Sequence, residues 1–173
     1  MDYRDENAAV FLRPMTAWDT EQIVRWRNQE NVKKYFLYRG EFTNETHLNW
    51  IEKKVKTGEV VQFIICDIND SAPLGSVYVR DIDRVNKKGE YGIFIGEEKA
   101  RNRGVGTAAC LLMCKYCFEE LDLHRIYLRV LEDNIRAQKS YEKAGFVREG
   151  VLKDDVFLDG SYRNIVWMAK VRK

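Results

Sequence analysis

A basic, glycine-bearing run at residues 101–107 (RNRGVGT) separates a short strand pattern from a long helix pattern. Residues 91–95 before it are apolar and β-rich, and residues 105–121 after it contain no proline and enough apolar side chains for a buried helix. A helix that begins at glycines leaves its first backbone N–H groups unpaired, carries the positive end of the helix dipole, and lets a ligand approach the backbone closely. The run therefore fits either a phosphate cradle charged by Arg101 and Arg103, or a helix-starting loop whose arginines are solvated.

Length and charge narrow the class of protein. The 173 residues suit one well-buried domain and are few for two, and residues 1–8 are expected to form a flexible N-terminus. Lysine plus arginine total 29 and aspartate plus glutamate total 27, so the net charge of +2 gives no general nucleic-acid footprint. Residues 1–7 do not resemble a secretory signal, and no apolar run is long enough to span a bilayer. We expect a cytoplasmic protein without a nucleic-acid or membrane partner.

The cysteines read as core residues rather than as a reactive or metal-binding set. One lies in a strand pattern and three lie along the apolar helix pattern: Cys66, Cys110, Cys114 and Cys117. The CxxC spacing at 114–117 falls well inside the helix, away from the helix start that would lower a thiol pKa. Because His47 and His124 are the two histidines and no second paired-cysteine cluster exists in the sequence, we expect no metal site.

Strand and helix patterns follow one another along the whole chain. Strands are expected at residues 10–13, 60–68, 74–82, 90–95, 124–131, 146–157 and 162–171. Helices are expected at 20–27, at 44–55 with an apolar face of Leu48, Ile51 and Val55, from about 104 to 121, and at 134–144. Three consecutive strands should form an antiparallel meander, followed by a β-α-β unit. The prediction is a mixed, mostly antiparallel α/β sheet of about seven strands flanked by about four helices.

Two other glycine-rich motifs compete for the same run. Residues 104–109 satisfy the GxGxxA pattern of dinucleotide-binding turns. Such a turn should follow its strand immediately and open its domain, whereas residues 96–103 intervene here and several elements come earlier. A Walker A loop is excluded because the sequence has no Gly-Lys-Ser/Thr. Both alternatives are therefore disfavoured.

In order and spacing, several motifs together resemble GCN5-related N-acetyltransferases (GNAT). Residues 101–106 match the family's pyrophosphate signature, an arginine or glutamine, two residues, glycine, one residue, then glycine or alanine. Residues 134–146 (NIRAQKSYEKAGF) are similar to its Asn…Ala…Tyr-Glu-Lys-x-Gly-Phe segment. Residues 11–15, 26–28, 149–152 and 159–162 look like the branch that includes ribosomal-protein alanine and aminosugar-nucleotide acetyltransferases. The resemblance covers about residues 10–171 and implies a single-domain GNAT fold that uses acetyl-CoA.

The resemblance also implies a set of coenzyme A contacts. The amides around the run 103–107 would hold the diphosphate, and the backbone of the preceding strand would pair with the pantetheine arm. The implied cofactor-binding residues are Phe94, Ile95, Gly96, Arg101, Arg103, Gly104, Val105, Gly106, Thr107, Asn134, Ser140 and Lys143. Lys99 and Lys139, with Lys143, are further candidates for the adenosine 3′-phosphate, although lysines on such surfaces are mostly solvated.

Acetyl transfer from a thioester needs a neutral amine, a stabilised oxyanion and a proton for the departing thiolate, but no enzyme nucleophile. Tyr141 matches the family's usual proton donor to the sulfur, and it also fits an aromatic packing residue on a helix face. Glu90, at the start of its strand, is the candidate general base acting through water, and it equally fits a solvated strand-end glutamate. Loss of the amine proton to bulk water would make a dedicated base unnecessary.

The acceptor amine is left open by the sequence. Tyr35, Phe36, Tyr38, Phe42 and Trp50 either line a pocket or cover the core. Residues 26–28 and 47–50 look like features of the aminosugar-nucleotide branch, whose aromatic and basic side chains would suit a sugar and its diphosphate. A polyamine would instead use carboxylates such as Glu30, Glu41, Glu45 or Glu52. A protein N-terminus is a third acceptor class, and a homodimer is compatible with the sequence. The alternative function is a non-catalytic coenzyme A-binding or regulatory module.

Overall fold

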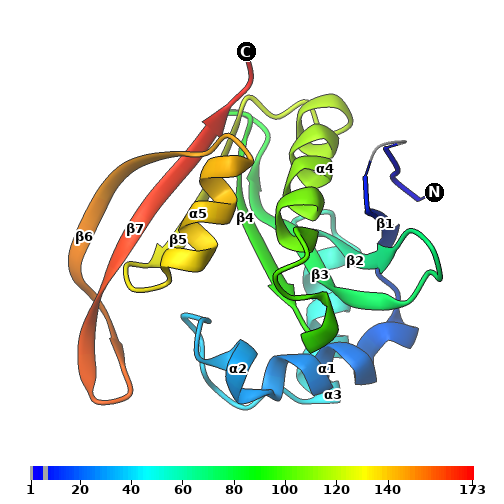
Figure 1. Cartoon of the computed structure of the whole chain (residues 1–173), viewed down its shortest axis with the longest axis horizontal. Helices are drawn as coiled ribbons and strands as arrows, with labels where there is room; N and C mark the ends of the chain where they lie inside the picture. Colours follow the sequence, from blue (N-terminus) through cyan, green and yellow to red (C-terminus); the bar gives the residue numbers. More distant parts are fainter. Residues whose placement is uncertain (1, 6–7) are drawn as a thin grey trace.

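One seven-stranded sheet organises the molecule (Figure 1). The computed structural model describes residues 2–5 and 8–173. The strands are β1 (Val10–Pro14), β2 (Val61–Asp67), β3 (Pro73–Asp83), β4 (Lys88–Ile95), β5 (Arg125–Leu131), β6 (Val147–Leu158) and β7 (Ser161–Val171). Their order across the sheet is β1-β2-β3-β4-β5-β7-β6, and every neighbouring pair is antiparallel except β4 and β5. The mostly antiparallel sheet of the prediction is confirmed.

Helices cover both faces of this sheet. The α-helices are α1 (Thr20–Asn28), α2 (Glu30–Lys33), α3 (Asn44–Trp50), α4 (Val105–Glu119) and α5 (Ile135–Lys143). Because strand side chains alternate, neighbouring residues enter different cores. Leu12 joins the cluster beneath α4, whereas Phe11 joins the cluster beneath α1 and the α3 region. The sheet is thus the middle layer between α4 and α5 on one side and α1 to α3 on the other.

The parallel pair β4–β5 separates part-way along its length. Its register contains three pairs, Lys88 with Arg125, Gly89 with Ile126, and Glu90 with Tyr127. Beyond them, β4 continues along β3 and β5 continues along β7. Residues 91–95 of β4 therefore keep one backbone edge that no strand occupies. This wedge-shaped opening between β4 and β5 places the site described below.

The N-terminal helices differ from the sequence prediction in two ways. Among the described residues there are five α-helices where about four were expected, and the additional one is the four-residue α2 in the connection after α1. The predicted helix 44–55 changes at its middle, where α3 passes into the π-helical segment η2 (Ile51–Val55). Ile51 is buried but Leu48 is 44% exposed, and His47 points inward instead. The predicted apolar face is therefore wrong at Leu48: the buried positions are spaced four residues apart, at 47 and 51.

The N-terminal segment pairs with the sheet edge at Tyr3, and the cysteines lie in the core. Of the predicted flexible segment 1–8, Met1, Glu6 and Asn7 lie outside the described residues. Tyr3 exchanges two backbone hydrogen bonds with Leu12, at 2.7 and 2.9 Å, beside the sheet edge. All four cysteines are buried free thiols, as predicted. Within the described ranges no group of histidine, cysteine or acidic residues could hold a metal, and no helix is long and apolar enough to cross a membrane.

Candidate active site

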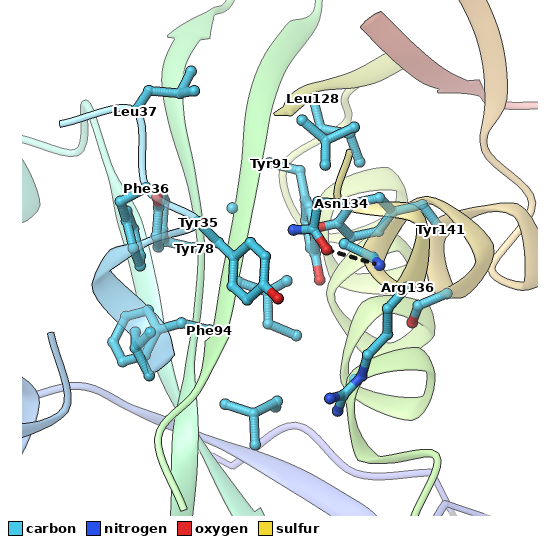
Figure 2. Close-up of a pocket in the computed structure, with 18 of the residues that line it drawn as sticks. Tyr35, Phe36, Leu37, Tyr78, Tyr91, Phe94, Leu128, Asn134, Arg136 and Tyr141 are labelled. Carbon is cyan, nitrogen blue, oxygen red and sulfur yellow. Dashed lines mark hydrogen bonds between the residues drawn. The ribbon is translucent and has the colours of Figure 1, made fainter. Parts of the chain in front are cut away.

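A cavity of about 1300 Å³ fills the opening between β4 and β5 and extends beneath α1 to α3. The start of α4 and one side of α5 form one wall, while the connection between α2 and α3 forms the opposite wall. Figure 2 shows Asn134, Arg136 and Tyr141 on one side and Tyr35, Phe36 and Phe94 on the other. The cavity thus joins the glycine-bearing turn to the N-terminal aromatic cluster.

The turn 101–107 presents free backbone amides to this cavity. Gly104 is the N-cap of α4 and has a φ of +76°, a left-handed conformation that glycine adopts without strain. As a glycine it offers no side chain to accept hydrogen bonds from the first helical amides. The amides of Val105, Gly106 and Thr107 therefore lack intrahelical acceptors at the positive end of a 15-residue helix. This is the arrangement that binds phosphate groups well.

The end of β4 is held in place from the α1 side. The Phe94 side chain is 7% exposed and lies edge-on to Trp26 and Phe36, with ring centroids 6.2 and 5.7 Å away. A Cβ at Gly96 would lie 2.1 Å from the Trp26 ring, so this position has no room for a side chain. The amides of Gly96 and Glu97 both donate to the Leu74 carbonyl, which bends the strand end. Packing thus occupies the Phe94 side chain and leaves the backbone edge facing the opening.

Helix α5 brings the second motif against the first. Asn134 caps the helix by accepting from the Ala137 amide at 3.3 Å, the dashed contact in Figure 2. The Ser140 hydroxyl lies 2.9 Å from the Thr107 hydroxyl at the start of α4. Arg136 extends from α5 into the cavity. The two motifs that the sequence separates by almost thirty residues meet at one hydrogen bond.

Tyr141 lies where the two strands diverge. Its ring is edge-on to Tyr91 of β4 at 6.0 Å and contacts Phe146 at 6.1 Å. Its hydroxyl makes no hydrogen bond to any described residue, and the side chain lines the cavity. Burial raises the pKa of Tyr141 well above its usual value. The phenol is therefore protonated throughout the neutral range.

Glu90 has partners that the sequence did not indicate. Its side chain is 7% exposed and accepts four hydrogen bonds, two from Arg80 of β3 and two from Arg129 of β5, at 2.9 to 3.2 Å. It is neither solvated nor free, and two guanidinium groups occupy its oxygens. The role of Glu90 as a general base stays a prediction.

The structure brings most of the predicted site residues to the cavity. The lining contains Glu90, Phe94, Ile95, Arg101, Gly104, Val105, Gly106, Thr107, Asn134, Lys139, Ser140, Tyr141 and Lys143. Gly96, Lys99 and Arg103 are not among the lining residues, and the Arg103 guanidinium lies 3.9 Å from the Asp67 carboxylate. The five aromatic residues of the N-terminal connection all line the cavity, so they do form a pocket wall. The roles of these residues in binding and catalysis stay predictions.

Sequence reasoning missed three lining residues on β3 and β5, namely Tyr78, Arg80 and Arg129. Gly92 makes room for one of them, since a Cβ there would lie 2.4 Å from the Tyr78 hydroxyl. From strand alternation alone, each of Arg80 and Arg129 is expected on one face of the sheet, but the alternation does not indicate that the two lie close together. Only the register, Arg80 with Glu90 and Glu90 with Tyr127, shows that they converge on one carboxylate.

Comparison with known proteins identifies the family. The model of the acetyltransferase (GNAT) domain matches residues 9–147. The chain belongs to the GNAT family. The spermidine N(1)-acetyltransferase of Escherichia coli is 29% identical over 161 residues, which cover 92% of this chain and 84% of that protein. YdaF of Bacillus subtilis, provisionally named a ribosomal N-acetyltransferase, is 30% identical over 104 residues, 60% of this chain and 56% of that protein.

Solved structures confirm the GNAT fold. The spermidine N-acetyltransferase of Vibrio cholerae, solved with CoA and spermine, superposes with a TM-score of 0.88 at 24% identity, covering 94% of this chain and 95% of that one. From the family model and the sequence relatives, this GNAT acetyltransferase uses acetyl-CoA to acetylate an amine, as the motifs predicted. The non-catalytic alternative is not supported by these enzyme relatives.

Proposed function

We propose that this GNAT enzyme transfers the acetyl group directly from acetyl-CoA to a primary amine while both are bound in the one cavity. The observation that carries the proposal is the separation of β4 from β5 after Glu90 and Tyr127, with Tyr141 beside the gap and the amides of α4 at one end of it. A thioester and an amine can then approach from opposite ends of the opening. Holding the two reactants together converts a bimolecular reaction into one with an entropic advantage.

The start of α4 and the edge of β4 together provide the contacts for coenzyme A. The amides of Val105, Gly106 and Thr107 bind the diphosphate, and Arg101 adds a charge at the same edge. The free backbone edge of Phe94 and Ile95 pairs with the pantetheine amides as an added strand would. Four further residues complete this half of the site: Asn134, Lys139, Ser140 and Lys143.

Tyr141 supplies the proton that the leaving group needs. The neutral amine attacks the thioester carbonyl, the tetrahedral adduct collapses, the carbon–sulfur bond breaks, and the thiolate takes the phenolic proton. Burial raises the pKa of Tyr141, which keeps the phenol protonated but also makes it a weak acid. The phenol therefore gives its proton to the sulfur only as it takes another from the ammonium formed on the adduct or from water, so that no free phenolate accumulates. No covalent enzyme intermediate is required.

The cationic side chains of the cavity favour the neutral amine. Guanidinium groups near an amine lower its pKa because they disfavour a second positive charge. Arg80 and Arg129 lie at the acceptor side of the opening, on the strands that flank Glu90. The amine can then lose its proton to water without a dedicated base.

Replacement of Tyr141 by phenylalanine tests this mechanism. We expect kcat to fall by roughly 10²- to 10⁴-fold, the usual contribution of a positioned acid, while the Kd of coenzyme A stays the same. Tyr162→Phe is the matched control, because Tyr162 is 65% exposed and outside the cavity. Acetyl transfer is followed by thiol release, and coenzyme A binding by calorimetry. An unchanged kcat would remove Tyr141 from the mechanism, and binding without transfer to any amine would favour a non-catalytic module.

The sequence left three acceptor classes open: a polyamine, a protein N-terminus and a nucleotide-linked aminosugar. The names of the relatives support the first two, since they include spermidine and ribosomal acetyltransferases. The four carboxylates that a polyamine would use, Glu30, Glu41, Glu45 and Glu52, are all exposed and outside the cavity lining. The charge of the cavity therefore becomes the feature that separates these classes.

A further inference from the structure

The charged side chains of the cavity are almost all positive. Eight lysines and arginines line it among the described residues, against the single carboxylate of Glu90. Arg101, Arg136, Lys139 and Lys143 lie at the cradle and on α5, where coenzyme A phosphates would neutralise them under the proposed function. The other half of the cavity keeps four cations, which coenzyme A does not account for.

Glu90 does not neutralise this second half. Its carboxylate is shared between Arg80 and Arg129, and the Asp81 carboxylate lies 3.6 Å from Arg80, so the charges within this group balance and none is left over for the rest of the cavity. Lys34 and Arg27 lie on the same side of the cavity and have no acidic partner among the described residues. Positive charge therefore remains uncompensated on Arg27 and Lys34, at the end of the cavity where the acceptor would bind under the proposed function.

Arg27 is the most informative of these residues. Its guanidinium lies over the Phe36 ring at 3.3 Å and beside the Phe42 ring at 4.9 Å, within the aromatic wall. Its Nε is buried without a hydrogen-bond partner, and no described residue accepts a hydrogen bond from the rest of the group. Burial lowers the pKa of Arg27 to about 10, which leaves it charged at neutral pH. Arg27 as a whole is half-buried, and a guanidinium partly removed from water is normally paired, because desolvating an unpaired charge is costly.

His47 adds a second unpartnered nitrogen beside Arg27. The residue is 1% exposed, lines the cavity and lies 5.8 Å from the Phe42 ring. Its Nδ1 is 3.0 Å from the Thr20 hydroxyl, while its Nε2 is buried without a partner. Arg27 on α1 and His47 on α3 thus both line this half of the cavity, and each has one buried nitrogen without a hydrogen-bond partner among the described residues.

We infer that the acceptor amine carries an anionic group, a phosphate ester or a carboxylate, which Arg27 binds in the aromatic wall while the amine reaches the opening between β4 and β5. A planar guanidinium recognises both of these anions through paired hydrogen bonds. A polycation such as spermidine would instead meet like charges and no free carboxylate. The inference rests on the proposed function and narrows its acceptor to one class of amine.

Matched pairs of amines test the inference with acetyl-CoA at saturation. Glucosamine 1-phosphate is compared with glucosamine, L-phenylalanine with L-phenylalaninamide, and both pairs with spermidine. We expect the anionic member of at least one pair to exceed its neutral partner and spermidine in kcat/KM by about tenfold or more, the range of a charge-assisted hydrogen bond. The pair that shows this preference identifies the source of the anion as phosphate or carboxylate.

Variants of Arg27 separate recognition from folding. Arg27→Gln should lower kcat/KM for the anionic member about tenfold more than for the neutral member, so that the preference for the anionic member is lost. Arg27→Lys keeps a cation in the fold and should retain part of the preference. The control is Arg25→Gln on the same helix, where the wild-type residue is exposed and pairs with Glu97 outside the cavity. Calorimetric binding of glucosamine 1-phosphate or L-phenylalanine to the CoA-saturated protein gives a second measure without turnover.

Two results would overturn the inference. Equal or better transfer to spermidine or to the neutral members refutes an anionic acceptor while leaving the acetyltransferase function intact. Equal losses for charged and neutral amines in Arg27→Gln would mean that Arg27 acts only on the fold. Transfer to no amine by a protein that binds acetyl-CoA would refute the proposed function itself, together with the inference.

Discussion

Replacement of Glu90 by glutamine distinguishes a structural carboxylate from a catalytic one. The Glu90 side chain is 7% exposed, and its four hydrogen bonds all come from Arg80 and Arg129. Glutamine keeps the shape but removes the charge, so two guanidinium groups remain close together without an anion between them. We expect this loss to destabilise the fold, because Glu90 lies at the last β4–β5 pair before the strands separate.

The size of the stability loss in Glu90→Gln depends on how far Arg80 and Arg129 are exposed to water. Removing one partner of a fully buried ion pair costs about 3–5 kcal/mol. The Arg80 and Arg129 side chains are 33% and 30% exposed, so water screens part of their repulsion. We therefore expect the free energy of unfolding to fall by about 2–3 kcal/mol. With a urea m-value of about 2 kcal/mol/M for a chain of this size, the midpoint falls by roughly 1–1.5 M.

Urea denaturation and steady-state kinetics are measured on the same preparations. Glu149→Gln is the matched control, since Glu149 accepts two hydrogen bonds from Arg125 on β5 but is 39% exposed. Its loss should cost about 1 kcal/mol or less. A Glu90→Gln protein of wild-type stability whose kcat has collapsed would refute the structural reasoning and favour the general base.

Three further changes probe the fold and the cradle. Burial lowers the pKa of His47 to about 4, below that of the unfolded chain, so the unfolded state binds the proton first. Wild-type stability relative to His47→Gln should therefore fall by about 3 kcal/mol between pH 6.5 and pH 4, and a pH-independent difference would contradict this. Gly96→Ala should lower the free energy of unfolding measured in urea by about 1–3 kcal/mol, because the added Cβ would clash with the Trp26 ring. Gly150→Ala is the control, because a Cβ there would have no atom within 4 Å. Arg101→Ala should weaken coenzyme A binding more than Arg103→Ala in calorimetry, since only Arg101 lines the cavity, and equal effects would refute this assignment.

Much of the framework could be read from local sequence because local physics decides it. The seven strands, the helix after Gly104 and the helix capped by Asn134 follow from periodicity, glycine conformation and capping. Where a tertiary contact decides, the prediction failed: Leu48 has the spacing of a buried residue, but a π-helical segment and the inward His47 leave it exposed.

The sequence by itself determined the family and predicted an acetyl-CoA cradle with the residues suited to hold it, since each depends on motifs a few residues long. Only the tertiary structure decided which charged side chains surround the end of the cavity where we propose that the acceptor binds. Arg27, Arg80 and Arg129 come from three separate elements, and their charges meet through strand register and helix packing. Electrostatic interactions depend on distance in space and on burial, neither of which the order of residues along a chain displays.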